Sequence, residues 1–259
     1  MSYIFRPMRI TKVNRWGASG LHLLISATIA AIALALMLFV WYPPPLFVAA
    51  GGKDLLLILL AVDVIVGPLS TLIIFKPGKW GLRFDLAAIG IVQLAALLYG
   101  MSIVYLARPA FIVFVKDRFE VATAVELQPE NLAQAKYEQF SEPPLLGPQL
   151  AVAEFPEDRA ERNKLVDLAL AGYDLQHFPK YWEPYEEHAK EIVAKGNTLE
   201  RLRKVEPKAA SVVEGYLKET GLSDDALRFF ILRAPRAWVA VAVDAKTAEP
   251  RKMLLYEQL

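Results

Sequence analysis

Residues 55–75 read LLLILLAVDVIVGPLSTLIIF, an apolar run of 21 residues with one acid, Asp63, near its middle. An α-helix rises about 1.5 Å per residue and needs about 20 residues to cross about 30 Å of hydrocarbon. The run is therefore long enough to span a membrane. An aspartate at its centre costs about 2.5–3.5 kcal/mol to insert, and this cost indicates that Asp63 has a role.

Two further stretches, residues 17–42 and about 84–107, have similar length and apolar character. The stretch 17–42 is longer than the apolar region of a cleavable signal peptide, so we expect it to remain as a signal-anchor helix. The short turn at residues 76–83 makes the second and third stretches an antiparallel pair. The sequence thus predicts that residues 1–107 form an N-terminal tail and three transmembrane helices.

Basic residues are distributed unevenly around these stretches. Because cytoplasmic loops are enriched in lysine and arginine, the side with more of them is predicted to be cytoplasmic. Three crossings then place residues 108–259 in the periplasm, and the protein in the inner membrane of a bacterium. Seven of the eight basic residues in 1–107 lie on the cytoplasmic side: Arg6, Arg9, Lys12, Arg15, Lys76, Lys79 and Arg83.

Residues 108–259 alternate between strand-like and helical segments and predict one α+β periplasmic domain with a small antiparallel sheet. Apolar, β-prone segments begin and end this domain, and segments with helical periodicity lie between them. The strands are expected near residues 111–115, 119–125, 227–232, 237–243 and 253–256. The helices are expected near residues 129–139, 157–171, 182–195 and 208–219.

Several functional classes are disfavoured. The chain has no cysteine, which excludes disulfides, thiolate metal sites and cysteine nucleophiles. It has neither a catalytic motif such as HExxH, GxSxG or a P-loop nor a basic stripe, so we expect no enzymatic activity, no cofactor and no nucleic-acid partner. We expect Glu183, Glu186, Glu187 and His188 to form a solvated helix face and not a metal site.

Asp63, Gly67, Pro68 and Gln93 form a candidate polar site within the membrane. Proline removes a backbone donor and bends a helix, and the antiparallel pairing brings Gln93 close to the depth of Asp63. One interpretation is structural: a protonated Asp63 donates a hydrogen bond to the Gln93 amide. Two others stay open, a proton or cation relay and a polar contact for another membrane helix.

Aromatic residues gather in one short segment of the second half, at Phe178, Tyr181, Trp182 and Tyr185. They are expected either to pack on the domain core or to form a partly exposed patch that binds a protein partner. The second interpretation rests on the enrichment of tryptophan and tyrosine among residues that dominate binding energy.

Several stretches of this sequence, such as 63–71 (DVIVGPLST) and 75–79 (FKPGK), resemble the type IV pilin accessory proteins of the TfpX/TfpZ type. One departure is Ala248, where a glycine is expected in the turn that follows Val243. The resemblance spans nearly the whole chain and is carried by residues 63–71 (DVIVGPLST), 75–79 (FKPGK), 84–86 (FDL), 93–94 (QL), 99–100 (YG), 108–120, 179–185 and 243–247 (VDAKT).

The resemblance implies a non-catalytic inner-membrane protein that helps one major pilin assemble into type IV pili. Its expected partners are the major pilin, inner-membrane lipid and other pilus assembly components. A competing interpretation is a membrane-anchored periplasmic regulator or sensor of an envelope protein. A transporter subunit is a third, disfavoured because the chain has three helices and one buried acid.

Overall fold

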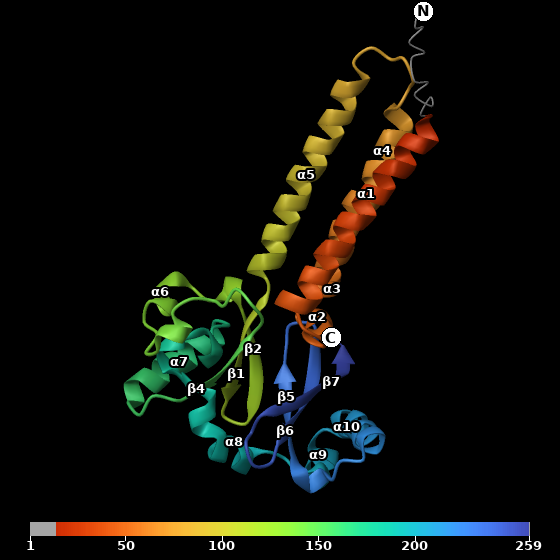
Figure 1. Cartoon of the computed structure of the whole chain (residues 1–259). Coiled ribbons are helices and arrows are strands. Elements are labelled where there is room, and N and C mark those ends of the chain that lie inside the picture. The colour runs from red at the N-terminus through yellow and green to blue at the C-terminus, as the bar shows by residue number, and fades with distance from the viewer. Residues whose placement is uncertain (1–13, 259) are drawn as a thin grey trace, which may run out of the picture. The chain divides into compact units, whose positions relative to one another are not determined.

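The computed structural model describes residues 14–258, which form two compact units (Figure 1). The first unit comprises residues 14–35 and 55–102, and the second comprises residues 36–54 and 103–258. The second unit therefore contains a segment, 36–54, that the sequence analysis assigned to the membrane part. The basic residues Arg6, Arg9 and Lys12, which contribute to the predicted orientation, lie outside the described residues.

Three helices are long and apolar enough to cross a membrane, which confirms the three long apolar helices expected from the sequence. They are Arg15–Trp41, Gly52–Ile74 and Leu82–Leu106. The first consists of α1 (Arg15–Leu36) and a π-helical turn, Met37–Trp41. The second consists of α3 (Gly52–Leu60), a π-helical stretch (Ala61–Val66) and α4 (Gly67–Ile74), and the third is α5 (Leu82–Leu106).

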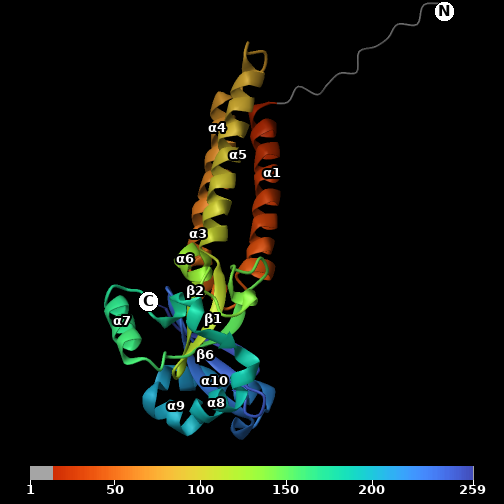
Figure 2. The same cartoon turned by 90° about the vertical axis from the view of Figure 1, so that its left-hand side faces the viewer.

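Within the first unit, polar contacts join the helices along their length. Figure 2 shows α1, α4 and α5 running beside one another. The Ser19 hydroxyl on α1 donates to the carbonyl of Pro68 at 2.9 Å. A lysine–aspartate pair, Lys79 and Asp85, lies where the turn after α4 enters α5. The remaining surface of these helices is largely exposed and apolar, as a lipid-facing surface requires.

Residues 36–54 were expected to end the first helix and form a simple loop, but they pack into the second unit. Tyr42 is fully buried, and its hydroxyl donates to the carbonyl of Val104 at 2.8 Å. A short helix, α2 (Leu46–Ala49), adds Leu46 and Ala49 to the apolar cluster that also contains Val239 of the sheet. Local composition did not reveal this because the contacts are with residues far along the chain.

The second unit is built on a mixed seven-stranded sheet in the order β4-β3-β1-β2-β5-β6-β7 (Figure 1). Neighbouring strands are antiparallel except for the parallel pairs β1–β3 and β2–β5. The predicted α+β class is confirmed, but the sheet is larger than expected and not wholly antiparallel. The strands are β1 (Pro109–Val115), β2 (Arg118–Thr123), β3 (Gln149–Ala153), β4 (Trp182–Pro184), β5 (Leu227–Arg233), β6 (Ala237–Asp244) and β7 (Pro250–Gln258).

Three of the four helices predicted for the second unit are shorter than expected, whereas the helix Pro207–Thr220 covers the whole of the predicted segment 208–219. The segment 182–195 begins with strand β4 and a 3₁₀ turn (Tyr185–His188), so its α-helix starts only at Ala189. Of these helices, α9 and α10 pack against β5, β6 and β7 (Figure 1). The α-helices are α6 (Pro129–Leu132), α7 (Arg159–Leu170), α8 (Ala189–Lys195), α9 (Leu199–Val205) and α10 (Pro207–Thr220). The remaining 3₁₀ turns are Ala124–Glu126, Glu138–Phe140, Leu175–His177, Pro179–Tyr181 and Asp224–Ala226.

The turn between β6 and β7 explains why a glycine was expected at position 248. Ala248 has φ +61°, a left-handed conformation that glycine adopts without steric cost. The turn is held by the Asp244 carboxylate, which accepts the amides of Lys246 and Thr247 at 2.9 and 3.1 Å. These amides and Arg251 hold the pKa of Asp244 down to about 2. The turn therefore forms despite the alanine.

Candidate functional site

The side chain of Asp63 is buried inside the first unit and lacks a partner for one oxygen. The residue is 6% exposed, and its Oδ1 has no hydrogen-bond partner among the described residues. It lines a pocket of about 140 Å³ together with His22 and Ser26 of α1 and Gln93 of α5. The other residues that line this Asp63 pocket are Ile25, Ile29, Gly90, Leu94 and Leu97.

The helix around Asp63 has an altered backbone register. In a π-helix each carbonyl pairs with the amide five residues on, so the carbonyl of Asp63 faces Pro68, which has no amide hydrogen to donate. The side chain of Gln93 donates its Nε2 to this carbonyl at 3.4 Å. This bond differs from the expected one, in which a protonated Asp63 carboxyl donates to the Gln93 amide: here Gln93 is the donor and the backbone carbonyl of Asp63 accepts. Gln93 compensates for the proline, and the carboxyl oxygen stays free.

Gly67 lets the Gln93 side chain approach the backbone. A Cβ built at Gly67 would overlap the amide group of Gln93. The structure thus brings together all four residues of the predicted intramembrane site: Asp63, Gly67 and Pro68 from one helix, and Gln93 from the next. Pro68 leaves the backbone carbonyl of Asp63 without an amide donor from its own helix. Gln93 supplies the donor, and Gly67 leaves room for the Gln93 side chain.

Replacing Gly67 by alanine is expected to lower the stability of the first unit by about 1–3 kcal/mol, the usual cost of overpacking. The added methyl group displaces Gln93 and leaves the Asp63 carbonyl without a donor. Thermal denaturation of the detergent-solubilised protein measures the effect. Gly20→Ala is the matched control, because a Cβ on Gly20 would meet nothing within 4 Å. Equal melting temperatures for the two variants would contradict this role for Gly67.

Helix α1 has a polar face that was not predicted from the sequence. Ser19, His22 and Ser26 follow the spacing of one helix face, which is the signal that could have identified it. The His22 ring and the Thr71 hydroxyl lie 2.6 Å apart, so His22 has a structural partner on α4. Ser26, in contrast, lines the Asp63 pocket.

The aromatic segment does not form the exposed patch that was considered. Trp182 is fully buried, with its ring 4.8 Å from that of Phe111, and its indole Nε1 donates to the Leu175 carbonyl at 3.3 Å. Tyr185 is also buried, and its hydroxyl donates to the carbonyl of Ala248 at 2.8 Å. This burial does not favour partner binding by Trp182 and Tyr185, and packing on the core accounts for both residues.

The other two aromatics of the segment are half-buried. Phe178 and Tyr181 line a pocket of about 270 Å³ whose walls also include Glu161 and Lys180. Glu161 accepts hydrogen bonds from Lys180 and from the Tyr181 hydroxyl, the latter at 2.8 Å. These bonds pair Glu161, Lys180 and Tyr181 with one another inside the pocket.

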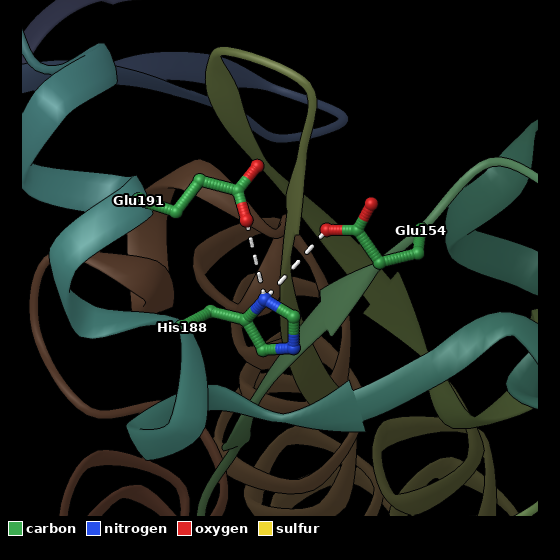
Figure 3. A group of neighbouring side chains, drawn as sticks. All are labelled: Glu154, His188 and Glu191. Carbon is green, nitrogen blue, oxygen red and sulfur yellow. Dashed lines mark hydrogen bonds and ion pairs between the residues drawn. The ribbon is translucent and has the colours of Figure 1, made fainter.

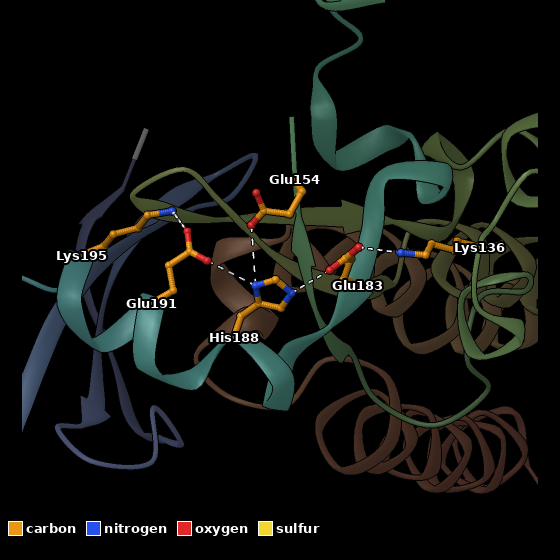
Figure 4. A network of polar contacts seen from close by, with 6 residues as sticks. All are labelled: Lys136, Glu154, Glu183, His188, Glu191 and Lys195. Atoms are coloured by element: carbon orange, nitrogen blue, oxygen red, sulfur yellow. Dashed lines mark hydrogen bonds and ion pairs between the residues drawn. The ribbon is translucent and has the colours of Figure 1, made fainter. Parts of the chain in front are cut away.

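The acids that were expected to form a solvated face divide into two kinds. Glu186 and Glu187 are exposed, as expected. Glu183 is half-buried and accepts hydrogen bonds from His188 Nε2 at 2.9 Å and from Lys136 Nζ at 2.8 Å (Figure 4). His188 therefore belongs to a polar network inside the second unit and not to a solvated helix face.

Comparison with known proteins gives consistent matches to one family. A family model described as Fimbrial assembly protein FimB matches residues 11–51. The fimbrial assembly protein of Dichelobacter nodosus serogroup I is 34% identical over 202 residues, which cover 77% of this chain and 73% of that protein. The serogroup E1 protein of the same organism is 30% identical over 228 residues, covering 86% and 88%. No solved structure matches the chain.

The similarity extends well beyond the matched N-terminal segment. Both relatives share at least 30% of their aligned residues with this chain, and the chain covers more than two thirds of each. The aligned lengths, 202 and 228 residues, are too great for the apolar helices to supply them alone. The chain therefore belongs to the FimB family of fimbrial assembly proteins, and its role is in the assembly of fimbriae or pili.

Proposed function

We propose that the protein is a non-catalytic inner-membrane accessory factor for type IV pilus biogenesis, which binds one kind of major pilin directly. The family supports a role in fimbrial assembly, and the three apolar helices support a location in a membrane. The observation that carries direct binding is the buried, unpartnered Oδ1 of Asp63 in its intramembrane pocket.

A free carboxyl oxygen at this place favours a membrane helix as the partner. Hydrocarbon offers no water to a polar group, so a hydrogen-bond donor must come from protein. Polar side chains that bond across membrane helices contribute about 0.6–2 kcal/mol each. A proton relay needs several ionisable groups in series, and the Asp63 pocket contains one other, His22, which already contacts Thr71.

The division of the chain into two units suits a partner that also has two parts. A pilin that awaits assembly has an apolar membrane helix and a globular periplasmic head. On this proposal the first unit contacts the helix and the second unit contacts the head. The basic residues Lys76, Lys79 and Arg83, in the turn between the second and third helices, support a periplasmic location for the second unit. Two modest contacts within one chain reinforce each other through effective concentration.

Photo-crosslinking in cells that make their own pilin tests this proposal. A probe at Ile29, which lines the Asp63 pocket, is expected to form an adduct with the major pilin. The matched control is a probe at Leu24, an exposed residue of the same helix outside the pocket. No pilin adduct at Ile29, or equal adducts at both positions, would contradict the proposal. Capture of a different envelope protein would support the regulator interpretation.

A further inference from the structure

Three side chains with metal-binding atoms converge in the second unit, outside the membrane site (Figure 3). Glu154 follows strand β3, His188 ends the 3₁₀ turn after β4, and Glu191 lies in the first turn of α8. His188 Nδ1 is 3.4 Å from Glu191 Oε2 and 3.8 Å from Glu154 Oε1. The three ligand atoms all lie within 4.8 Å of one another.

The hydrogen bond of His188 Nε2 determines which ring nitrogen is available to bind a metal ion. His188 Nε2 lies 2.9 Å from Glu183 Oε2, and Lys136 binds the other oxygen of Glu183 at 2.8 Å (Figure 4). A neutral histidine that donates from Nε2 keeps its lone pair on Nδ1, which points between Glu154 and Glu191. In metal sites, the histidine nitrogen that does not bind the ion commonly donates to a carboxylate, which fixes the orientation of the ring.

The contacts of His188 Nδ1 are longer than that of Nε2. Charge-assisted N–H···O bonds are about 2.7–2.9 Å long, and the contact at Nε2 has this length. Nδ1 has only a long hydrogen bond to Glu191 at 3.4 Å, and Glu154 lies 3.8 Å away, so neither carboxylate is a tight partner of this nitrogen. Of the two ring nitrogens of His188, Nε2 therefore has a tight partner and Nδ1 does not.

The spacing of the three atoms suits a small divalent ion. Bonds of about 2.0–2.2 Å in a tetrahedral site place neighbouring ligand atoms roughly 3.3–3.6 Å apart. The contact between His188 and Glu191 already has this length, and the Glu154 oxygen would have to move closer to His188. The Glu154 carboxylate can make this movement because its side chain is 43% exposed.

We propose that Glu154, His188 and Glu191 bind a divalent transition-metal ion of the Zn²⁺ type, with Glu183 as the residue that positions His188. Imidazole favours transition metals over Ca²⁺ and Mg²⁺, and three protein ligands leave one position for water. Lys195 binds the other oxygen of Glu191, so lysines hold two of the carboxylates in orientation (Figure 4). The sequence predicted a solvated helix face around His188 and no metal site; the part played by Glu154 was not foreseen because Glu154 lies far from His188 along the chain.

The ion would tie together segments that are distant in sequence. It would join the end of β3 to the start of α8. Both lie near β4, a three-residue strand at the edge of the sheet. An ion that binds the folded state and not the unfolded state stabilises the fold by mass action. Metal binding is therefore expected to raise the melting temperature of the protein.

Zn²⁺ titration of the full-length, detergent-solubilised protein, stripped of metal with a chelator, tests the site. Calorimetry is expected to show one Zn²⁺ per chain and a raised melting temperature. Glu154→Gln and His188→Ala are expected to remove both effects, and Glu183→Gln to weaken binding about tenfold. Glu187→Gln, at an exposed acid beside His188, is the matched control and is expected to bind as the wild type does.

Two results would overturn the proposal. One is the absence of Zn²⁺ binding by the wild type, which would leave an ionic network around His188 as the whole explanation. The other is unchanged binding by Glu154→Gln, which would place the ion elsewhere. Circular dichroism shows whether each variant is folded. Glu154→Gln keeps the test valid if His188→Ala fails to fold, because it changes only the end of a half-exposed side chain.

Discussion

Asp63→Leu is expected to leave the protein in the membrane at its normal level and to remove most surface fimbriae from the cell. The leucine abolishes the insertion cost of the acid, and Oδ1 of Asp63 has no partner among the described residues to lose. Stability should therefore be unchanged or higher. If the carboxyl binds a partner helix with about 0.6–2 kcal/mol, co-purification of pilin should fall roughly 3–30-fold. Electron microscopy of fimbriae measures the consequence.

Asp63→Asn distinguishes a polar contact from a charge. The asparagine keeps one oxygen and adds a donor, so we expect a smaller loss of fimbriae than with leucine. Ile65→Leu is the control, because Ile65 is exposed on the same helix and the substitution keeps its apolar character. Normal fimbriation in both Asp63 variants, with normal protein levels, would show that the carboxyl is dispensable.

Trp182→Ala is expected to destabilise the second unit by about 3–5 kcal/mol, the usual cost of removing a buried aromatic side chain. Trp182 packs against Phe111 and Phe140 with ring centroids 4.8 and 5.7 Å away, and its indole donates to the Leu175 carbonyl. Urea denaturation followed by circular dichroism measures the loss. Phe155→Ala is the control, since Phe155 is exposed in the same unit.

The same variants separate packing from partner binding in the aromatic segment. Trp182→Phe keeps most of the buried apolar volume and is expected to retain fimbrial assembly. A stable Trp182→Phe protein that nevertheless failed in assembly would give the indole a role beyond the core. A loss of less than about 1 kcal/mol in Trp182→Ala would contradict the burial argument itself.

The membrane part was largely predictable from the sequence. Crossing hydrocarbon imposes a local requirement for length and composition, so each apolar helix could be recognised in its own stretch. The short turn between the second and third helices also placed Gln93 near Asp63 without any coordinates. The resemblance to pilin accessory proteins agrees with the fimbrial assembly family to which the chain belongs.

The details of the candidate site were not predictable in this way. The sequence indicated a proline kink but not a π-helical register, which decides that Gln93 bonds the Asp63 carbonyl and not its carboxyl. The strands β3 and β4 were missed because they are short and lie beside or contain proline, which leaves no clear alternation to recognise. The exposed or buried state of an aromatic residue likewise depends on which distant residues cover it.

The sequence by itself determined that three helices can cross a membrane, that an α+β unit follows, and that Asp63 carries an unusual cost. These properties depend on neighbours within about 20 residues, where periodicity and composition act directly. Only the tertiary structure decided that the Asp63 oxygen stays free, that Trp182 is core, and that Glu154 meets His188. Those outcomes depend on side chains from segments that are distant along the chain, and local pattern contains no information about which of them meet.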